Sequence, residues 1–178
     1  DICPKAGTSV VLCAGPSLNL RLQETKDFIE KNKSIVFAAN YQYFDIQSHF
    51  TYFTDPERFT SQVLKIKSGH ILVSGYLASK IDHTRYKKLI SEVQKSKNIY
   101  QVGQKTGAPK DYRRNIILGP KGQVPYISLG TAGLSAMIMA SFAQPKTVLV
   151  VGEDGAEGDN CIKKLMFDGR VLKYGKPE

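Results

Sequence analysis

The chain has 178 residues, of which 42% are hydrophobic, and it carries a formal net charge of +9 at pH 7. This length suits one domain with its own core, and no apolar run approaches the roughly 20 residues that a membrane-spanning helix requires. The positive charge indicates an anionic partner. Because the basic residues are dispersed, a nucleotide or an acidic surface explains the charge as well as a nucleic acid does, and a nucleic acid is not favoured.

The first residues and the cysteines bear on where the protein works. Residues 1–5 lack the hydrophobic run of a signal peptide and begin without methionine, which is typical of a trimmed chain. Cys3, Cys13 and Cys161 show no metal-ligand spacing, and Cys13 is interpreted as a small core residue. This usage fits a reducing compartment. We therefore expect a cytoplasmic protein, with a peripheral position at the inner membrane face as the alternative.

Short apolar runs alternate with helical patterns along the chain. Runs of strand length lie at residues 9–13, 34–39, 50–53, 70–74, 99–102, 115–118 and 147–151. Helices are predicted at about 19–32, 56–65, 84–97 and 130–142. This alternation predicts a single-domain, Rossmann-like α/β fold, with a mostly parallel sheet and helices on both faces. Residues 156–178 are expected to form an incomplete lid or tail with at most a short edge strand, at 171–173.

Two of the predicted helices have a distinct apolar stripe. In the first helix the stripe consists of Leu18, Leu22, Thr25 and Ile29. In the last helix the residues at helical spacing are Leu134, Met137, Ile138, Ser141 and Phe142.

The chain is organised around residues 10–18, where an apolar, β-branched run meets a Gly-Pro-Ser turn and a helical pattern follows. That is how a buried parallel strand passes into a helix. Gly15 would let backbone N–H groups approach a bound group closely, and Pro16 pre-sets its own φ angle. Ser17 can cap the helix or donate its hydroxyl to a phosphate. The alternative is an ordinary strand–helix turn.

Polar or glycine-bearing segments follow four of the predicted strands, at residues 15–17, at Asn40, at residues 54–56 and at residues 152–154. In a parallel sheet such strand ends gather at one edge, so they are expected to form a cleft. Residues 130–133 open another helix, which would add free N–H donors and a hydroxyl.

Each of these residues also has an ordinary explanation. Asn40 tolerates a strained turn, and Asp55, which precedes a proline, is more often a helix cap than a functional acid. Glu153 and Asp154 could hold a ribose, a metal or a substrate hydroxyl, but acids in glycine-bounded turns are commonly just solvated.

The sequence lacks two common nucleotide-binding motifs, since neither Gly-x-x-x-x-Gly-Lys-Ser/Thr nor Gly-x-Gly-x-x-Gly occurs. This argues against a P-loop kinase and a typical dinucleotide-binding dehydrogenase. His49 and His70 are expected at the edge opposite the cleft, and His83 precedes a helix. None is well placed as a catalytic base.

Three patches, in order, resemble the bacterial sialyltransferases of glycosyltransferase family 42. Residues 13–18 resemble their Gly-Asn-Gly-Pro-Ser-Leu loop, and residues 39–44 resemble their Cys-Asn-Gln-Phe-Tyr-Phe segment. Residues 131–133 and 148–154 are similar to their Thr-Ser-Gly helix start and to the following strand, which ends in Gly-Ile-Asp. Uncharacterised proteins and archaeal hydroxymethylpterin pyrophosphokinases share this scaffold. Residues 57–125 match no segment of the family.

The resemblance implies that the whole chain is one nucleotide-sugar-binding domain and a sialyltransferase-like glycosyltransferase. It would bind a CMP-sugar at the carboxyl edge of the sheet and serve a glycan acceptor, without a cofactor. Residues 15–17 would face the nucleotide phosphate, and residues 131–133 would line the cytidine pocket. The binding residues that it implies are Ala14, Gly15, Pro16, Ser17, Asn40, Asp55, Thr131, Ala132, Gly133 and Asp154.

The chain departs from the family at several of these positions. Residues 13–14 replace a Gly-Asn pair, and Ala132 replaces a serine. The general-base histidine of the family follows its last matched strand, whereas no histidine follows His83 here, so no catalytic residue is assigned. Two alternatives therefore stay open. One is a pyrophosphokinase-like transfer with Mg²⁺ on Asp55 and Asp154, and the other is a non-catalytic nucleotide- or glycan-binding protein. A homo-oligomer is compatible with all three.

Overall fold

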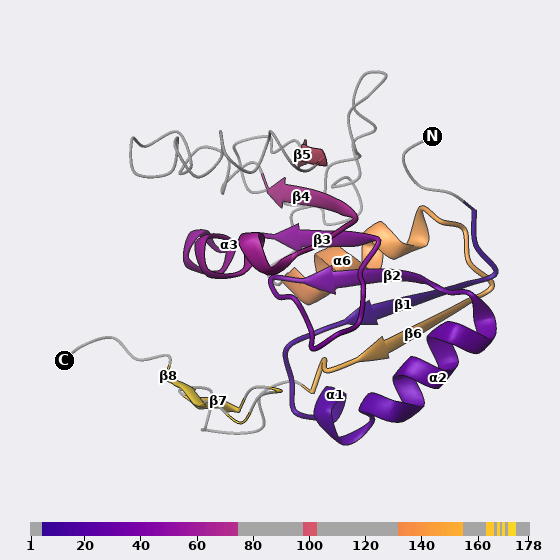
Figure 1. Cartoon of the computed structure of the whole chain (residues 1–178), viewed down its shortest axis with the longest axis horizontal. Helices are drawn as coiled ribbons and strands as arrows, with labels where there is room; N and C mark the ends of the chain where they lie inside the picture. The colour runs from indigo at the N-terminus through magenta and orange to yellow at the C-terminus, as the bar shows by residue number, and fades with distance from the viewer. Residues whose placement is uncertain are drawn as a thin grey trace, which may run out of the picture.

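A six-stranded sheet with order β5-β4-β3-β2-β1-β6 forms the centre of the molecule, and all five of its strand pairings are parallel (Figure 1). The computed structural model describes residues 5–74, 98–102, 132–154, 163–165, 167, 169 and 171–173. The strands are β1 (Thr8–Leu12), β2 (Ile35–Ala39), β3 (Phe50–Phe53), β4 (His70–Ser74), β5 (Asn98–Val102) and β6 (Thr147–Val151). The predicted α/β class is confirmed.

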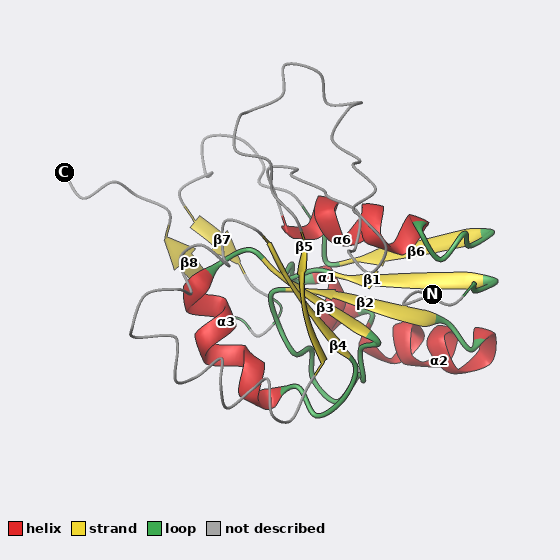
Figure 2. Ribbon diagram, turned by 90° about the horizontal axis from the view of Figure 1, so that it is seen from above, coloured by secondary structure: helices red, strands yellow, loops and turns green. Residues whose placement is uncertain are grey.

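The helices lie on both faces of this sheet (Figure 2). They are α1 (Ser17–Leu20), α2 (Leu22–Asn32), α3 (Pro56–Gln62), which continues into the 3₁₀ helix η1 (Val63–Lys65), and α6 (Ala132–Ser141). The helices α2 and α3 share one face and α6 covers the other. The predicted helix at 84–97 and the predicted strand at 115–118 lie outside the described residues.

The strand order creates a switch point between β1 and β6. From β1 to β5 each strand lies beside its predecessor, and the chain then returns to the other side of β1 as β6. Right-handed crossovers keep the early helices on one face, and the reversal of direction puts α6 on the other. In open α/β sheets, ligands bind outside the carboxyl ends of the strands at such a point.

The first helical segment is interrupted once. Arg21 has φ −115° and ψ 24°, which ends α1 before α2 begins, so the predicted single helix at 19–32 is wrong in its start and its continuity. The predicted stripe is confirmed in its position: Leu18 and Thr25 are buried, and Leu22 and Ile29 pack against the core.

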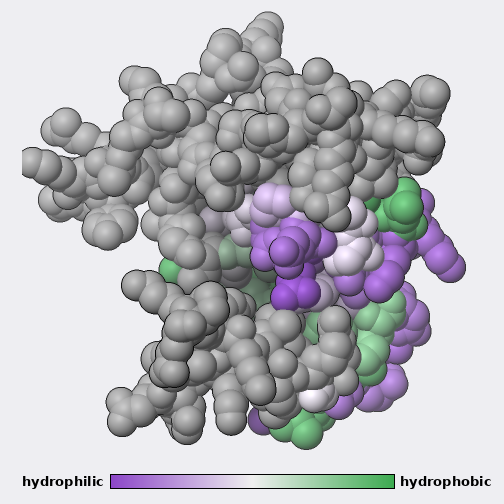
Figure 3. Space-filling view, turned by 90° about the vertical axis from the view of Figure 1, so that its left-hand side faces the viewer, coloured by the Kyte–Doolittle hydropathy of each residue, from purple (hydrophilic) through white to green (hydrophobic). Residues whose placement is uncertain are grey.

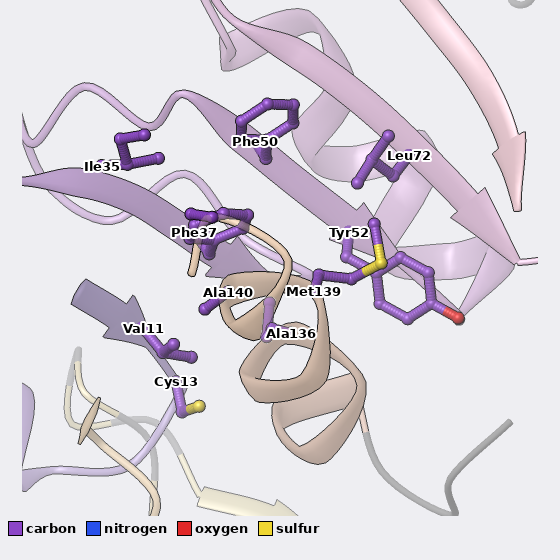
Figure 4. Close-up of a cluster of buried hydrophobic side chains, with 12 residues drawn as sticks. Val11, Cys13, Ile35, Phe37, Phe50, Tyr52, Leu72, Ala136, Met139 and Ala140 are labelled. Atoms are coloured by element: carbon purple, nitrogen blue, oxygen red, sulfur yellow. The ribbon is translucent and has the colours of Figure 1, made fainter. Parts of the chain in front are cut away.

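Helix α6 packs on the sheet through buried small residues, and three residues of the predicted stripe, Met137, Ile138 and Phe142, pack against the same cluster while only partly buried. Ala136 and Ala140 are buried together with Met139 against the sheet, whereas Leu134 is 41% exposed (Figure 4). The sheet supplies the bulk at this interface, since the rings of Phe37 and Phe50 stack at 5.1 Å on this face. Large side chains below leave room only for small ones above.

On the α2 face, the connection from β2 to β3 contains no helix, although parallel connections usually do. Residues 40–49 cross the face as a loop whose Tyr41, Tyr43 and Ile46 are buried in the core. Phe167 comes from the segment after β6 and packs on the same aromatic group, with its ring 5.0 Å from that of Tyr43. Phe167 therefore belongs to the main core.

Two short strands complete the described structure. The strands β7 (Lys163–Leu165) and β8 (Val171–Lys173) pair antiparallel. The predicted strand at 171–173 is confirmed, and its partner β7 was missed. Within the described ranges, no helix has both the length and the apolarity to cross a membrane.

Candidate functional site

The ends of β1 and β6 meet at the switch point, at the carboxyl edge of the sheet, which lies on the side of the molecule that faces the viewer in Figure 3. The N–H of Cys13 donates to the carbonyl of Val151 (2.8 Å), and three further hydrogen bonds join the segments that follow the two strands. The N–H of Gly15 donates to the carbonyl of Gly152 (2.7 Å), and the N–H of Gly152 donates to Oγ of Ser17 (3.0 Å). The N–H of Ser17 donates to Oδ2 of Asp154 (2.7 Å). We call Gly15, Ser17, Gly152 and Asp154 the β1–β6 corner.

Glycine is required at two positions of the β1–β6 corner. A Cβ at residue 15 would collide with Oδ2 of Asp154 and lie 2.6 Å from the carbonyl oxygen of Gly152. Gly152 itself has φ +83°, and a Cβ there would lie 2.7 Å from the carbonyl carbon of Cys13. Gly15 was predicted to allow the close approach of a bound group, and in the structure the atoms that approach it belong to the chain's own Asp154 and Gly152.

The neighbouring acid, Glu153, turns toward the start of α6. A Cβ added to Gly133 would collide with Oε2 of Glu153 and lie 3.0 Å from Sγ of the buried Cys13. The partial positive charge of a helix N-terminus favours a carboxylate at this place. The sequence analysis named Glu153 only as an acid in a turn and missed this contact, for which the glycine at 133 was the available signal.

Two carboxylates thus lie side by side in sequence at the switch point, each directed to the start of a helix. Both Glu153 and Asp154 are exposed. The backbone N–H of Ser17 already donates to Asp154. The groups that remain for a ligand here are therefore carboxylate oxygens, which accept hydrogen bonds. Carboxylates of this kind hold the hydroxyl groups of ribose and of sugars.

Asn40 lies at the end of β2 and joins it to the end of β3. Its φ is 62°, its Oδ1 accepts from the N–H of Thr54 (3.0 Å), and its Nδ2 donates to Oγ1 of Thr54 (3.4 Å). Both of its amide groups thus have structural partners. The strained-turn explanation given for Asn40 is confirmed.

Asp55 is the cap of α3. Its Oδ1 accepts from the N–H groups of Glu57 (2.8 Å) and Arg58 (3.2 Å), and Pro56 is the first helical residue. The capping explanation for Asp55 is therefore confirmed. Within the described residues, no three histidine, cysteine or acidic side chains lie close enough together to hold a metal ion.

The remaining predicted residues lie next to the β1–β6 corner, at the start of α6, or outside the described residues. Pro16 is the N-cap residue of α1, and Ala14 accepts a hydrogen bond at its carbonyl from the N–H of Phe167 (3.0 Å). Ala132 and Gly133 begin α6. Thr131 lies outside the described residues. Phe167 was not anticipated, because an isolated aromatic residue in a weakly patterned tail gives no signal.

The buried ring of Tyr43 holds the end of β2 in place at the carboxyl edge of the sheet. The hydroxyl of Tyr43 donates to the carbonyl of Ala39, the last residue of β2, at 2.5 Å. Burial raises the pKa of Tyr43 well above its usual value, so it stays a neutral donor. This bond fixes the end of β2 next to Asn40.

The described histidines lie at the opposite edge, as the sequence indicated. Nδ1 of His49 accepts from the N–H of Val36 (3.0 Å), and the carbonyl of His49 accepts from the N–H of His70 (2.8 Å) at the start of β4. Burial, and then the charge of His70, lower the pKa of His49. His83 lies outside the described residues.

Comparison of the chain with protein-family models, with curated proteins and with solved structures finds no match.

Proposed function

We propose that the chain binds a CMP-sugar at the carboxyl edge of its sheet and acts as a sialyltransferase-like glycosyltransferase. The observation that carries this proposal is the β1–β6 corner, where Gly15, Ser17, Gly152 and Asp154 are joined by hydrogen bonds at the switch point. Ligands of open α/β sheets bind at this place. The resemblance to family 42 covers the same corner.

In this proposal the carboxylates of Glu153 and Asp154 accept hydrogen bonds from the hydroxyl groups of the ligand. Ser17 positions Asp154 through its N–H, and Asp154 accepts hydrogen bonds from ribose hydroxyls. Glu153, placed at the start of α6, faces the sugar. The net charge of +9 attracts the phosphate from solution.

Transfer requires a base as well as a binding site. The acceptor hydroxyl would attack the anomeric carbon while the bond from that carbon to the phosphate oxygen breaks. CMP would leave with the electron pair, and the hydroxyl proton would pass to a carboxylate. Glu153 and Asp154 are the acids at the corner, whereas His49 and His70 lie at the other edge.

Because His49 and His70 lie at the other edge of the sheet, neither can act as a general base at the corner. This favours a second function, that of a nucleotide- or glycan-binding protein without turnover. The two functions share the corner and differ in one observable. A transferase releases CMP from a CMP-sugar when an acceptor is present, and slowly by hydrolysis when it is absent. A binding protein releases no CMP in either case.

The test is calorimetric titration of the full chain with CMP, CDP, ATP and a CMP-sugar, with and without Mg²⁺. We expect the cytidine nucleotides to bind without Mg²⁺. Ser17→Ala should weaken binding about ten-fold, because the N–H of Gly152 loses its acceptor at the corner, while the backbone N–H that holds Asp154 is unchanged. Ser61→Ala, which removes an exposed hydroxyl of α3, is the matched control and should bind normally.

Failure of every cytidine nucleotide to bind would contradict the proposal. Binding of ATP that depends on Mg²⁺ would favour the pyrophosphokinase-like alternative. Cytidine binding without release of CMP would leave the non-catalytic function.

A further inference from the structure

A hollow of about 290 Å³ lies on the α2 face, between residues 42–48 and residues 65–68. Its origin is the β2–β3 connection. Residues 40–49 cross the sheet without a helix, and an irregular segment fills less of the layer than a helix would. The hollow lies beside the amino ends of β3 and β4, whereas the β1–β6 corner is at the carboxyl edge.

The two walls of the hollow are fixed to each other. The N–H of His70 donates to the carbonyl of His49 (2.8 Å). Gly69 has φ +91°, and a Cβ there would lie 2.8 Å from the same carbonyl oxygen, so only glycine permits this approach. Oγ of Ser48 and Oγ1 of Thr51 are 2.7 Å apart in the buried interior beneath. The shape of the hollow is thus built into the fold.

The hollow carries a net positive charge. Lys65 and Lys67 line it, and among the described residues neither forms an ion pair. Asp45 also lines it, but its carboxylate is neutralised by Lys26 at 2.6 Å. Two ammonium groups on one side of a small hollow attract a phosphate group as point charges.

The neutral lining suits a sugar. Nε2 of Gln42 donates to the carbonyl of Ile46 (2.9 Å), which fixes this amide at the wall, and Gln47 adds a second amide. Phe44 is 39% exposed, and its ring is held by an edge contact with Phe167 at 5.3 Å. Amides can bond to hydroxyl groups, and an aromatic ring offers an apolar surface to the carbon side of a sugar ring.

We infer that this hollow is a second binding site, which takes a phosphorylated molecule of the size of one monosaccharide. Lys65 and Lys67 bind the phosphate, and the amide groups with Phe44 contact the sugar. The volume lies at the lower end of small-molecule sites, which suits a sugar phosphate better than a nucleotide. The inference stands whether or not the carboxyl edge binds a CMP-sugar.

The experiment is an amide ¹H–¹⁵N NMR titration of the full chain with glucose 6-phosphate, inorganic phosphate and glucose at fixed ionic strength. We expect saturable shifts in residues 42–48 and 65–69 with glucose 6-phosphate, and weaker binding of the other two. Affinity of inorganic phosphate equal to that of glucose 6-phosphate would overturn the sugar contacts. Equal affinity of glucose would overturn the phosphate contact, and absence of saturable shifts would overturn the site.

Two matched double variants distinguish binding in the hollow from attraction of the phosphate by the net charge of the protein. Lys65→Gln/Lys67→Gln should weaken glucose 6-phosphate about ten-fold. Lys31→Gln/Lys146→Gln removes the same charge outside the hollow and should leave the affinity unchanged. Equal weakening in both double variants would show attraction by net charge alone and would overturn the inference.

Discussion

The backbone N–H of Ser17 and Oδ2 of Asp154 form a 2.7 Å hydrogen bond between residues 137 positions apart. This bond joins the start of α1 to the segment that follows β6, so the switch point is bridged by the chain itself. The acids that would contact a ligand are therefore positioned before the ligand arrives. Pre-positioning lowers the ordering cost of binding.

Gly15→Ala should destabilise the protein by about 2 kcal/mol, because its Cβ meets both Asp154 and the backbone oxygen of Gly152. Urea unfolding measures this change. The control is Gly7→Ala, where an added Cβ has no atom within 4 Å, and which should change stability by less than about 0.5 kcal/mol. Equal effects of the two substitutions would contradict the described corner.

The contact between Gly133 and Glu153 should appear as coupling in a double-mutant cycle. Gly133→Ala forces the Glu153 side chain aside, so it should cost at least about 0.5 kcal/mol less when Glu153→Ala is already present. Unfolding of the four proteins gives this number. Asp154→Ala should not rescue Gly15→Ala in the same way, because the oxygen of Gly152 remains 2.6 Å away. Strict additivity at 133 and 153 would refute the contact.

Asp55 is expected to matter for stability and not for ligand binding. Asp55→Ala should cost about 1 kcal/mol through loss of the α3 cap, while Asp55→Ser should cost only a few tenths, because serine also caps. Urea unfolding and nucleotide titration of both variants check this. If Asp55→Ser folds normally but loses nucleotide or Mg²⁺ binding, the acid has a functional role that capping does not explain.

His49 should make stability fall as the pH decreases. Its pKa is lowered below the unfolded value of 6.5, so the unfolded chain takes up the proton more readily. The contribution is present above pH 6.5 and is lost as the pH falls through the lowered pKa. Unfolding at pH 7.5, 6.5 and 5.5 should show a steeper loss for the wild-type protein than for His49→Gln, whose amide oxygen can still accept from Val36. Identical slopes would contradict this role.

The strands could be predicted from sequence because apolar, β-branched runs bounded by polar or glycine residues leave few alternatives. Residues 50–53, 70–74 and 147–151 form strands with the predicted bounds, and those at 9–13, 34–39 and 99–102 differ by one residue. The gathering of strand ends at one edge followed from parallel pairing. Placing residues 15, 17, 152 and 154 together was therefore within reach of sequence reasoning.

What sequence reasoning missed depends on contacts distant in the chain. Helix α6 is apolar on several sides, so its periodicity did not reveal that Ala136 and Ala140 face the sheet. The bulk of Phe37 and Phe50 decides this orientation, and it belongs to other strands. In the same way, the sequence around Phe167 does not predict its contact with the loop after β2. Such packing is set by the assembled surface rather than by local pattern.

The most direct test of the central claim is a crystal of the full chain soaked with CMP. The account predicts density for the nucleotide at the β1–β6 corner, with ribose hydroxyl groups within hydrogen-bond distance of the Asp154 carboxylate and the bond from Ser17 to Asp154 retained. An empty corner at saturating CMP, or CMP bound at the amino edge of the sheet, would contradict it.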